Sequence, residues 1–201
     1  MKHARKLFAI VALFCGYAAH ADEGTVRIMM STGEGDISID LYVDKAPVTA
    51  GNFLKLVDHG DLDGASFYRV VNSDNDNGAP RITVIQGGLD DAGEAFATIE
   101  HETTAQTGIR HTDGVISMAR GAVGTASTEF FICIGDQPGL DFGATRNPDG
   151  QGFAAFGKVV SGMDVVRRIN ALPADAPSDS AYTKGQILAA PVVITSVHRA
   201  E

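Results

Sequence analysis

Tryptophan, cysteine and basic residues are scarce in this sequence. Its 201 residues include no Trp and only 2 Cys, Cys15 and Cys133. Because Cys15 lies in a leader that we expect to be removed, Cys133 has no partner for an intramolecular disulfide, and stability must come from packing. Cys133 lies in the apolar run 130–134, a setting typical of a small buried hydrophobe rather than a nucleophile.

Positive charge is especially scarce beyond residue 21. Residues 22–201 hold 13 Lys and Arg against 25 Asp and Glu, a net charge of −12, compared with −9 for the whole chain. Such a surface repels phosphate backbones and anionic headgroups, which argues against nucleic-acid binding and against an electrostatic membrane anchor. A chain of about 180 residues suits one domain, and we expect a monomer.

The longest apolar run lies at the N-terminus. A basic start, residues 2–6, precedes the apolar segment 7–19, and Ala19-His20-Ala21 forms an A-x-A cleavage site. This pattern predicts a signal peptide, residues 1–21, that is cut after Ala21, whereas a membrane-spanning helix needs about 20 apolar residues. We therefore expect a periplasmic domain, residues 22–201, with no membrane anchor after cleavage.

The remaining residues predict a mainly β fold. Residues 37–42 alternate apolar and polar side chains after the tight turn Gly33-Glu34-Gly35, the period of a half-buried strand. A helix is expected from Pro47 to Gly60, with Thr49 as a candidate cap, and a second over 163–171. The eight expected strands are 25–31, 37–42, 66–71, 84–86, 114–118, 130–134, 154–159 and 192–198.

Many short strands between glycine-rich turns indicate a barrel or a sandwich. Two isolated helices are well suited to close the ends of a barrel. Two polar, turn-rich stretches, 72–81 and 141–152, are typical of surface insertions.

No metal, cofactor or hydrolase motif is complete in the sequence. The stretch 73–78 has the composition of a calcium loop, but with Gly78 as its central glycine the closing carboxylate would fall on Val84. The turn at Gly33 lacks the third glycine of a dinucleotide fingerprint, and no serine lies in a G-x-S-x-G motif. We therefore expect neither a metal nor a cofactor. Four histidines remain after cleavage without the spacing of a zinc pair, and we expect them to be solvated: His59, His101, His111 and His198.

One arginine lies in an apolar strand, Ser66-Phe67-Tyr68-Arg69-Val70-Val71. In a regular strand Arg69 shares the face of Phe67, which places a guanidinium near apolar surface. A strand arginine is more often solvent-facing or salt-bridged. The aromatic and β-branched neighbours nevertheless make Arg69 a candidate for function.

Six blocks follow one another along the chain: KAPVTAGNF (45–53), FYRV (67–70), IQGG (85–88), GVISMAR (114–120), FFI (130–132) and FGKV (156–159). Together they resemble the cyclophilins, which are peptidyl-prolyl cis-trans isomerases, over about residues 25–198. The triplet at 118–120 and the leader resemble the bacterial periplasmic branch. The resemblance implies a closed eight-stranded antiparallel β-barrel capped by two α-helices, in agreement with the expected elements.

The resemblance also implies a site. Arg69 matches the catalytic arginine of the family, Gln86 its groove glutamine, and Phe131 the floor of its proline pocket. Ala119 and Arg120 match the strand edge that pairs with the substrate backbone. Three further pocket positions, where the family has methionine, leucine and histidine, are Val84, Leu140 and Phe153.

Three positions depart from the family pattern. Glu129 replaces a glutamine two residues before Phe131 and is expected to pair with Arg69, either orienting it or competing with substrate. Thr83 stands where the family usually has a pocket phenylalanine. Gly139 replaces a large aromatic, usually Trp, which predicts weak binding of the drug cyclosporin.

These residues suit the chemistry of an isomerase. Rotation about an X-Pro bond breaks no bond, so it needs no nucleophile or metal. A fixed guanidinium can stabilise the twisted amide by donating to the proline nitrogen. We expect a peptidyl-prolyl isomerase that acts on proline-containing unfolded or partly folded exported polypeptides. An alternative is a Pro-peptide-binding chaperone of the same fold, with turnover weakened by Glu129 and the insertion at 72–81.

Overall fold

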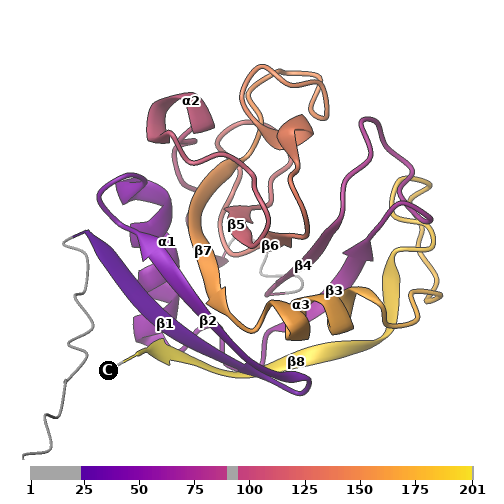
Figure 1. Cartoon of the computed structure of the whole chain (residues 1–201), viewed down its shortest axis with the longest axis horizontal. Coiled ribbons are helices and arrows are strands. Elements are labelled where there is room, and N and C mark those ends of the chain that lie inside the picture. Colours follow the sequence, from indigo (N-terminus) through magenta and orange to yellow (C-terminus); the bar gives the residue numbers. More distant parts are fainter. Residues whose placement is uncertain (1–23, 90–94, 201) are drawn as a thin grey trace, which may run out of the picture.

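Eight strands close into an antiparallel barrel (Figure 1), as the family resemblance implies, and their order around it is β1-β2-β7-β5-β6-β4-β3-β8. The computed structural model describes residues 24–89 and 95–200, and the predicted signal peptide, residues 1–21, lies outside them. The strands are β1 (Thr25–Thr32), β2 (Gly35–Tyr42), β3 (Ser66–Val71), β4 (Val84–Gly88), β5 (Val115–Met118), β6 (Phe130–Cys133), β7 (Ala154–Ser161) and β8 (Ile187–Arg199). The helices are α1 (Pro47–His59), α2 (Thr104–Thr107) and α3 (Met163–Asn170), with a 3-10 turn, η2 (Pro138–Leu140).

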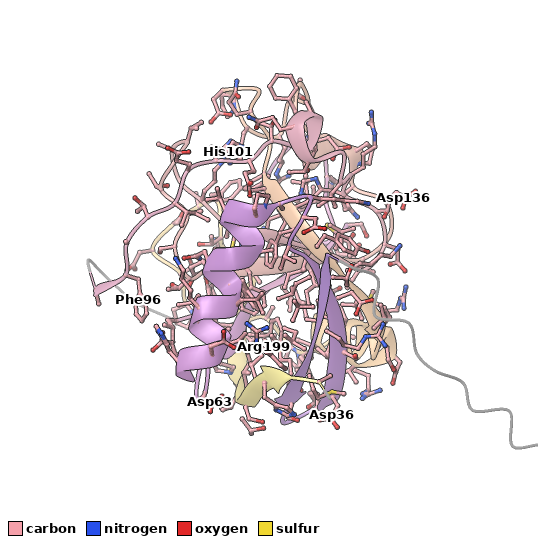
Figure 2. The ribbon with its side chains drawn as sticks, turned by 90° about the vertical axis from the view of Figure 1, so that its left-hand side faces the viewer. Asp36, Asp63, Phe96, His101, Asp136 and Arg199 are labelled. Atoms are coloured by element: carbon pink, nitrogen blue, oxygen red, sulfur yellow. The ribbon has the colours of Figure 1, made fainter. Side chains whose placement is uncertain are left out.

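Helix α1 begins at Pro47 and ends before Gly60, which adopts the left-handed conformation (φ 72°) that stops a helix. Its N-cap is Ala46, whose side chain makes no capping bond, so the expectation that Thr49 caps it is wrong. Instead Glu102, distant in sequence, accepts from the backbone N–H of Thr49 at 2.7 Å and from its hydroxyl at 2.6 Å. Figure 2 shows α1 along one side of the molecule with Arg199 beside it.

A third helix, α2, is absent from the prediction of two. It is a single turn, and Thr103 and Gln106 close a reciprocal capping box at its start. The Thr104 hydroxyl accepts from the backbone N–H of Phe142 at 2.9 Å, so α2 supports the segment 141–152. In the described part of the chain, no helix has the length and apolar character that crossing a bilayer requires.

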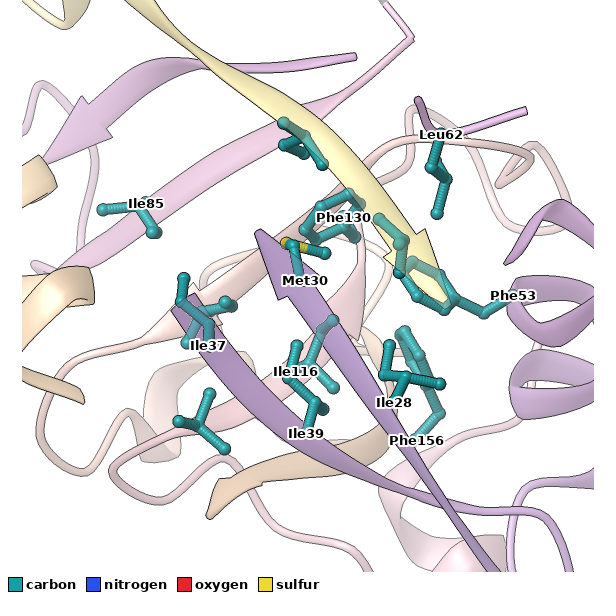
Figure 3. Packing of buried hydrophobic residues seen from close by; sticks show 14 of the residues in the cluster. Ile28, Met30, Ile37, Ile39, Phe53, Leu62, Ile85, Ile116, Phe130 and Phe156 are labelled. Atoms are coloured by element: carbon teal, nitrogen blue, oxygen red, sulfur yellow. The ribbon is translucent and has the colours of Figure 1, made fainter. Parts of the chain in front are cut away.

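The barrel interior is filled by aromatic and branched side chains. Phe53 of α1 enters it and packs against Phe130 and Phe156, with ring centroids 5.3 and 5.1 Å apart (Figure 3). These three rings are fully buried. Helix α1 therefore closes one end of the barrel by contributing to its core.

Alternation along β6 divides its residues between two clusters. Phe130 and Ile132 lie in the barrel core, whereas Phe131 and Cys133 lie in a second cluster outside it. Cys133 is fully buried, as expected, and burial raises the pKa of its thiol. The same strand therefore supplies both the core and the base of the site.

Candidate active site

A pocket of about 590 Å³ lies over the second cluster. All nine residues selected from the sequence line it: Arg69, Val84, Gln86, Ala119, Arg120, Glu129, Phe131, Leu140 and Phe153. Other lining residues come from loops, among them Ile82, Thr125, Ser127, Arg146, Asn147, Pro148 and Tyr182. The barrel thus brings together residues that are dispersed over more than half of the chain.

A β-bulge turns Arg69 toward this pocket. Phe67 pairs with Gly87 on β4. Arg69, two residues later, pairs with Gln86, so Tyr68 is an extra residue in β3. Phe67 therefore lies in the barrel core while Arg69 lines the pocket. The expectation that Arg69 shares the face of Phe67 is wrong because regular alternation does not continue through a bulge.

Two glutamines hold the Arg69 guanidinium. Gln86 Oε1 accepts from Nη1 at 2.7 Å, and Gln186 Oε1 accepts from Nε at 2.9 Å and from Nη2 at 2.6 Å. Burial lowers the pKa of Arg69 from its ordinary value, but a guanidinium still keeps its proton at neutral pH. The result is a cation with a fixed orientation at the pocket wall.

An apolar recess lies beside this cation. Phe131, 5% exposed, meets Phe153 edge-on with ring centroids 5.3 Å apart. Val84 and Leu140 are buried in the same cluster. The recess has the polarity that suits a small aliphatic ring, and it adjoins a fixed hydrogen-bond donor.

The sequence of this chain also matches a model of a known protein family. The family model described as "Cyclophilin type peptidyl-prolyl cis-trans isomerase/CLD" matches residues 26–199. The chain belongs to this cyclophilin family. A peptidyl-prolyl cis-trans isomerase of Acinetobacter baylyi is 34% identical over 90% of this chain and 88% of its own. Peptidyl-prolyl cis-trans isomerase B of Escherichia coli is 36% identical over 71% of this chain and 82% of its own.

Relatives of this chain also occur in organisms other than bacteria. A peptidyl-prolyl cis-trans isomerase-like 1 protein of Rhizopus delemar is 34% identical over 75% of this chain and 83% of its own. A crystal structure of a Cryptosporidium parvum cyclophilin matches with a TM-score of 0.64 at 18% identity, covering 88% of this chain and 98% of that chain, and shows the same fold. Because fungal and bacterial relatives match alike, the assignment to a bacterial periplasmic branch stays a prediction.

Glu129, the departure in this cyclophilin's groove, is linked to Arg69 through Gln86. Its Oε2 accepts from Gln86 Nε2 at 3.0 Å and from the Tyr68 hydroxyl. Gln86 thus lies between the two charges, with Oε1 toward Arg69 and Nε2 toward Glu129. Among the residues that the structure describes, this relay replaces the expected Arg69–Glu129 pair. Burial and the adjacent carboxylate raise the pKa of Tyr68, which stays a donor.

The Arg120 side chain is engaged within the protein. It is 1% exposed, pairs with Asp149 (Nη1–Oδ2 2.7 Å) and donates to the carbonyl of Gly152 at 2.9 Å. Its hydrogen bonds lower the pKa of Asp149 to about 2. The Arg120 side chain therefore ties the segment 141–152 to the pocket edge. The family resemblance implies that the backbone of Arg120, rather than its side chain, pairs with the substrate.

A buried ion pair joins the two predicted insertions. Arg146 in 141–152 forms a bidentate pair with Asp76 in 72–81, with both N–O distances 2.8 Å and side chains 2% and 0% exposed. The expectation of surface insertions is wrong for these two residues, because each charge is neutralised and hydrogen-bonded by the other. Since Arg146 lines the pocket, the insertions are part of its wall.

Pro80 of the first insertion packs against Gly139. A Cβ added to Gly139 would lie 2.4 Å from Pro80 Cγ, so Pro80 occupies the space that a larger side chain at position 139 would need. The insertion thus replaces the missing aromatic with part of its own loop. Weak cyclosporin binding stays a prediction.

His111 is buried, not solvated. It is 1% exposed, its Nδ1 lies 2.8 Å from Asp141 Oδ1, and its Nε2 lies 3.0 Å from Ser117 Oγ. This order matches a hydrolase triad, but Ser117 is fully buried and its hydroxyl is closed to substrate. The His111 ring stacks on Phe131 at 5.9 Å, so the network supports the pocket floor from behind.

Two residues at the site, Gln186 and Tyr182, were not predicted from the sequence. Both precede β8, which begins at Ile187 rather than at the expected residue 192. Gln186 is fully buried, and the Tyr182 ring centroid lies 5.4 Å from Arg69 Cζ. The apolar pair at 187–188 was the available signal, because it marks the true start of the strand.

Proposed function

We propose that this cyclophilin accelerates cis–trans isomerisation of X-Pro bonds in exported polypeptides that are unfolded or partly folded. The observation that carries the proposal is the fixed guanidinium of Arg69 beside an apolar recess floored by Phe131. The exported setting rests on the leader pattern of residues 1–21.

Arg69 acts on the transition state in this mechanism. Amide resonance opposes rotation about the X-Pro bond with a barrier of about 18–20 kcal/mol. In the twisted state the proline nitrogen regains its lone pair and becomes a hydrogen-bond acceptor. The two glutamines engage three N–H groups of Arg69, and a guanidinium has five. Donors therefore remain for the substrate, and their fixed position favours the twisted amide over the planar one.

The apolar recess binds the proline ring of the substrate. Phe131, Leu140 and Phe153 enclose a space in which a pyrrolidine ring loses water contact. The flanking peptide can then turn while the ring is held, with the strand edge at Ala119 available for its polar groups. Gln86 lines the same pocket, but its amide is already bonded to Arg69 and Glu129. Rotation needs no bond cleavage, so these binding contacts and one donor suffice.

Arg69→Ala tests the mechanism in an assay of X-Pro peptide isomerisation with residues 22–201. We expect kcat/KM to fall by about 100-fold or more, the cost of removing one preorganised donor in other active sites. Arg27→Ala is a matched control, because Arg27 is also a strand arginine but is 52% exposed and paired with Asp40. Unchanged activity in Arg69→Ala would refute the mechanism.

The second candidate is a Pro-peptide-binding chaperone with weakened turnover. The observation that favours it is the carboxylate of Glu129, which engages the amide of Gln86 at 3.0 Å and so competes with substrate for that donor. Peptide binding without acceleration in the wild-type protein would support this candidate over the isomerase.

A further inference from the structure

Gln186 connects Arg69 to the insertion 72–81. Its side chain is fully buried, its Oε1 accepts two hydrogen bonds from Arg69, and its Nε2 donates to the backbone carbonyl of Asn75 at 2.8 Å. Its own backbone carbonyl accepts from the N–H of Val70 at 2.9 Å. The glutamine is thus held at both ends of its amide and through its main chain.

The loops that carry these groups lie side by side. Figure 1 shows the segment after β3 and the segment before β8 next to each other on the right of the view. Asn77 Nδ2 donates to the carbonyls of Tyr182 and Lys184 at 3.2 and 2.9 Å, and Asn75 Nδ2 donates to the carbonyl of Gly185 at 2.9 Å. Side chains of one loop therefore bind the backbone of the other, which fixes where Gln186 enters the site.

The two glutamines constrain Arg69 in different ways. Gln86 contacts only Nη1, about which the rest of the guanidinium can still rotate. Gln186 contacts Nε and Nη2, which lie on one edge of the planar group. With both glutamines in place, three nitrogen atoms are fixed, and the plane of the guanidinium has one orientation.

We propose that Gln186 is a positioning residue for Arg69, and that the insertion 72–81 holds Gln186 in place through Asn75. The role rests on the proposed function, since it concerns the same reaction. Because Gln186 does not belong to the apolar cluster that forms the recess, its loss should impair turnover and leave peptide binding intact. Misplacing a catalytic group by about 1 Å can cost about 100-fold in rate.

Gln186→Leu tests this role, because leucine has similar bulk but no acceptor. In the purified protein we expect kcat for an X-Pro peptide to fall about tenfold or more, within the range that misplacement explains, with KM unchanged. Gln186→Glu keeps an acceptor for both donors of Arg69 but loses the donor to the Asn75 carbonyl, so it should recover only part of the loss. Gln137→Leu is the matched control, since Gln137 is also a buried glutamine, 8% exposed, but bonds to the Ile134 carbonyl instead; it should keep wild-type kcat.

A double-mutant cycle separates positioning from general destabilisation. If Gln186 acts through Arg69, Gln186→Leu should lower kcat/KM no further in an Arg69→Ala background. An equal loss in both backgrounds, or wild-type kcat in Gln186→Leu, would overturn the role. Should a thermal melt show that Gln186→Leu does not fold, Gln186→Asn shortens the side chain and keeps it polar, and wild-type kcat there also overturns it. An inactive wild-type protein overturns both proposals, whereas an active wild type with unimpaired Gln186 variants overturns the positioning role alone.

Discussion

The carboxylate of Asp76 holds the insertion 72–81 against the body of the protein. It accepts two hydrogen bonds from Arg146, both at 2.8 Å, and one each from the backbone N–H groups of Gly78 and Ile82 at 2.9 and 2.8 Å. Asp76→Ala removes all four at once. It leaves a buried guanidinium whose remaining acceptors are the Pro80 carbonyl and the Tyr182 hydroxyl, both at 2.8 Å.

The two acceptors that Arg146 keeps determine how much stability Asp76→Ala should cost. Removing one partner of a buried ion pair costs about 3–5 kcal/mol. Because Arg146 keeps two acceptors, we expect the lower end, about 3 kcal/mol of unfolding free energy. For a domain of about 180 residues, each kcal/mol lowers Tm by about 2–4 °C, so the midpoint should fall by about 6–12 °C.

Urea and thermal unfolding followed by circular dichroism measure this difference, and pH supplies a second signature. Burial raises the pKa of Asp76, but the hydrogen bonds from Arg146, Gly78 and Ile82 outweigh it, and the net pKa is lowered. A lowered pKa stabilises the fold above the ordinary carboxyl pKa of about 3.9, and this contribution is lost as pH falls through the folded-state value. The gap between wild type and Asp76→Ala should therefore be full near neutral pH and narrow below about pH 4.

Asp74→Ala is the matched control, since Asp74 lies exposed in the same loop and should change stability by no more than about 0.5 kcal/mol. A loss below about 1 kcal/mol in Asp76→Ala would show that the pair is not buried as described. A gap that stays constant down to about pH 2 would contradict the assigned pKa direction.

Two further predictions concern Glu129 and the leader. Glu129→Gln keeps an oxygen that can accept from Gln86 and Tyr68, so kcat/KM should stay within about threefold of wild type; a large gain in the peptide assay would instead support the chaperone with weakened turnover. Expression of the full chain in a Gram-negative host should yield a periplasmic protein that begins at Asp22 by N-terminal mass analysis. Uncut protein in the cytoplasm would contradict export.

Local patterns predict most of the barrel. Alternation of apolar and polar residues marks strands such as β2, and Pro47 and Gly60 mark the limits of α1. These signals depend on neighbours within a few residues, so they can be read without a structure. Helix α2 is missing from the prediction because one turn is too short to show a helical period.

The nine pocket residues are predictable for a different reason. They match family positions within or between the six sequence blocks, and the structure brings all of them to one pocket. The direction of Arg69 was not predictable in this way, because the extra residue Tyr68 reverses the face of β3 only when its pairing with β4 is known.

The sequence by itself indicated eight strands and the helices α1 and α3 in their order along the chain and, through its resemblance to a family, nine of the residues that line the pocket. Only the tertiary structure decided how the site is supported. Gln186 bonds to Arg69 across 117 positions, and Arg146 to Asp76 across 70. Such pairs carry no local period, and whether a charge is buried or solvated depends on which loops meet once the barrel has closed.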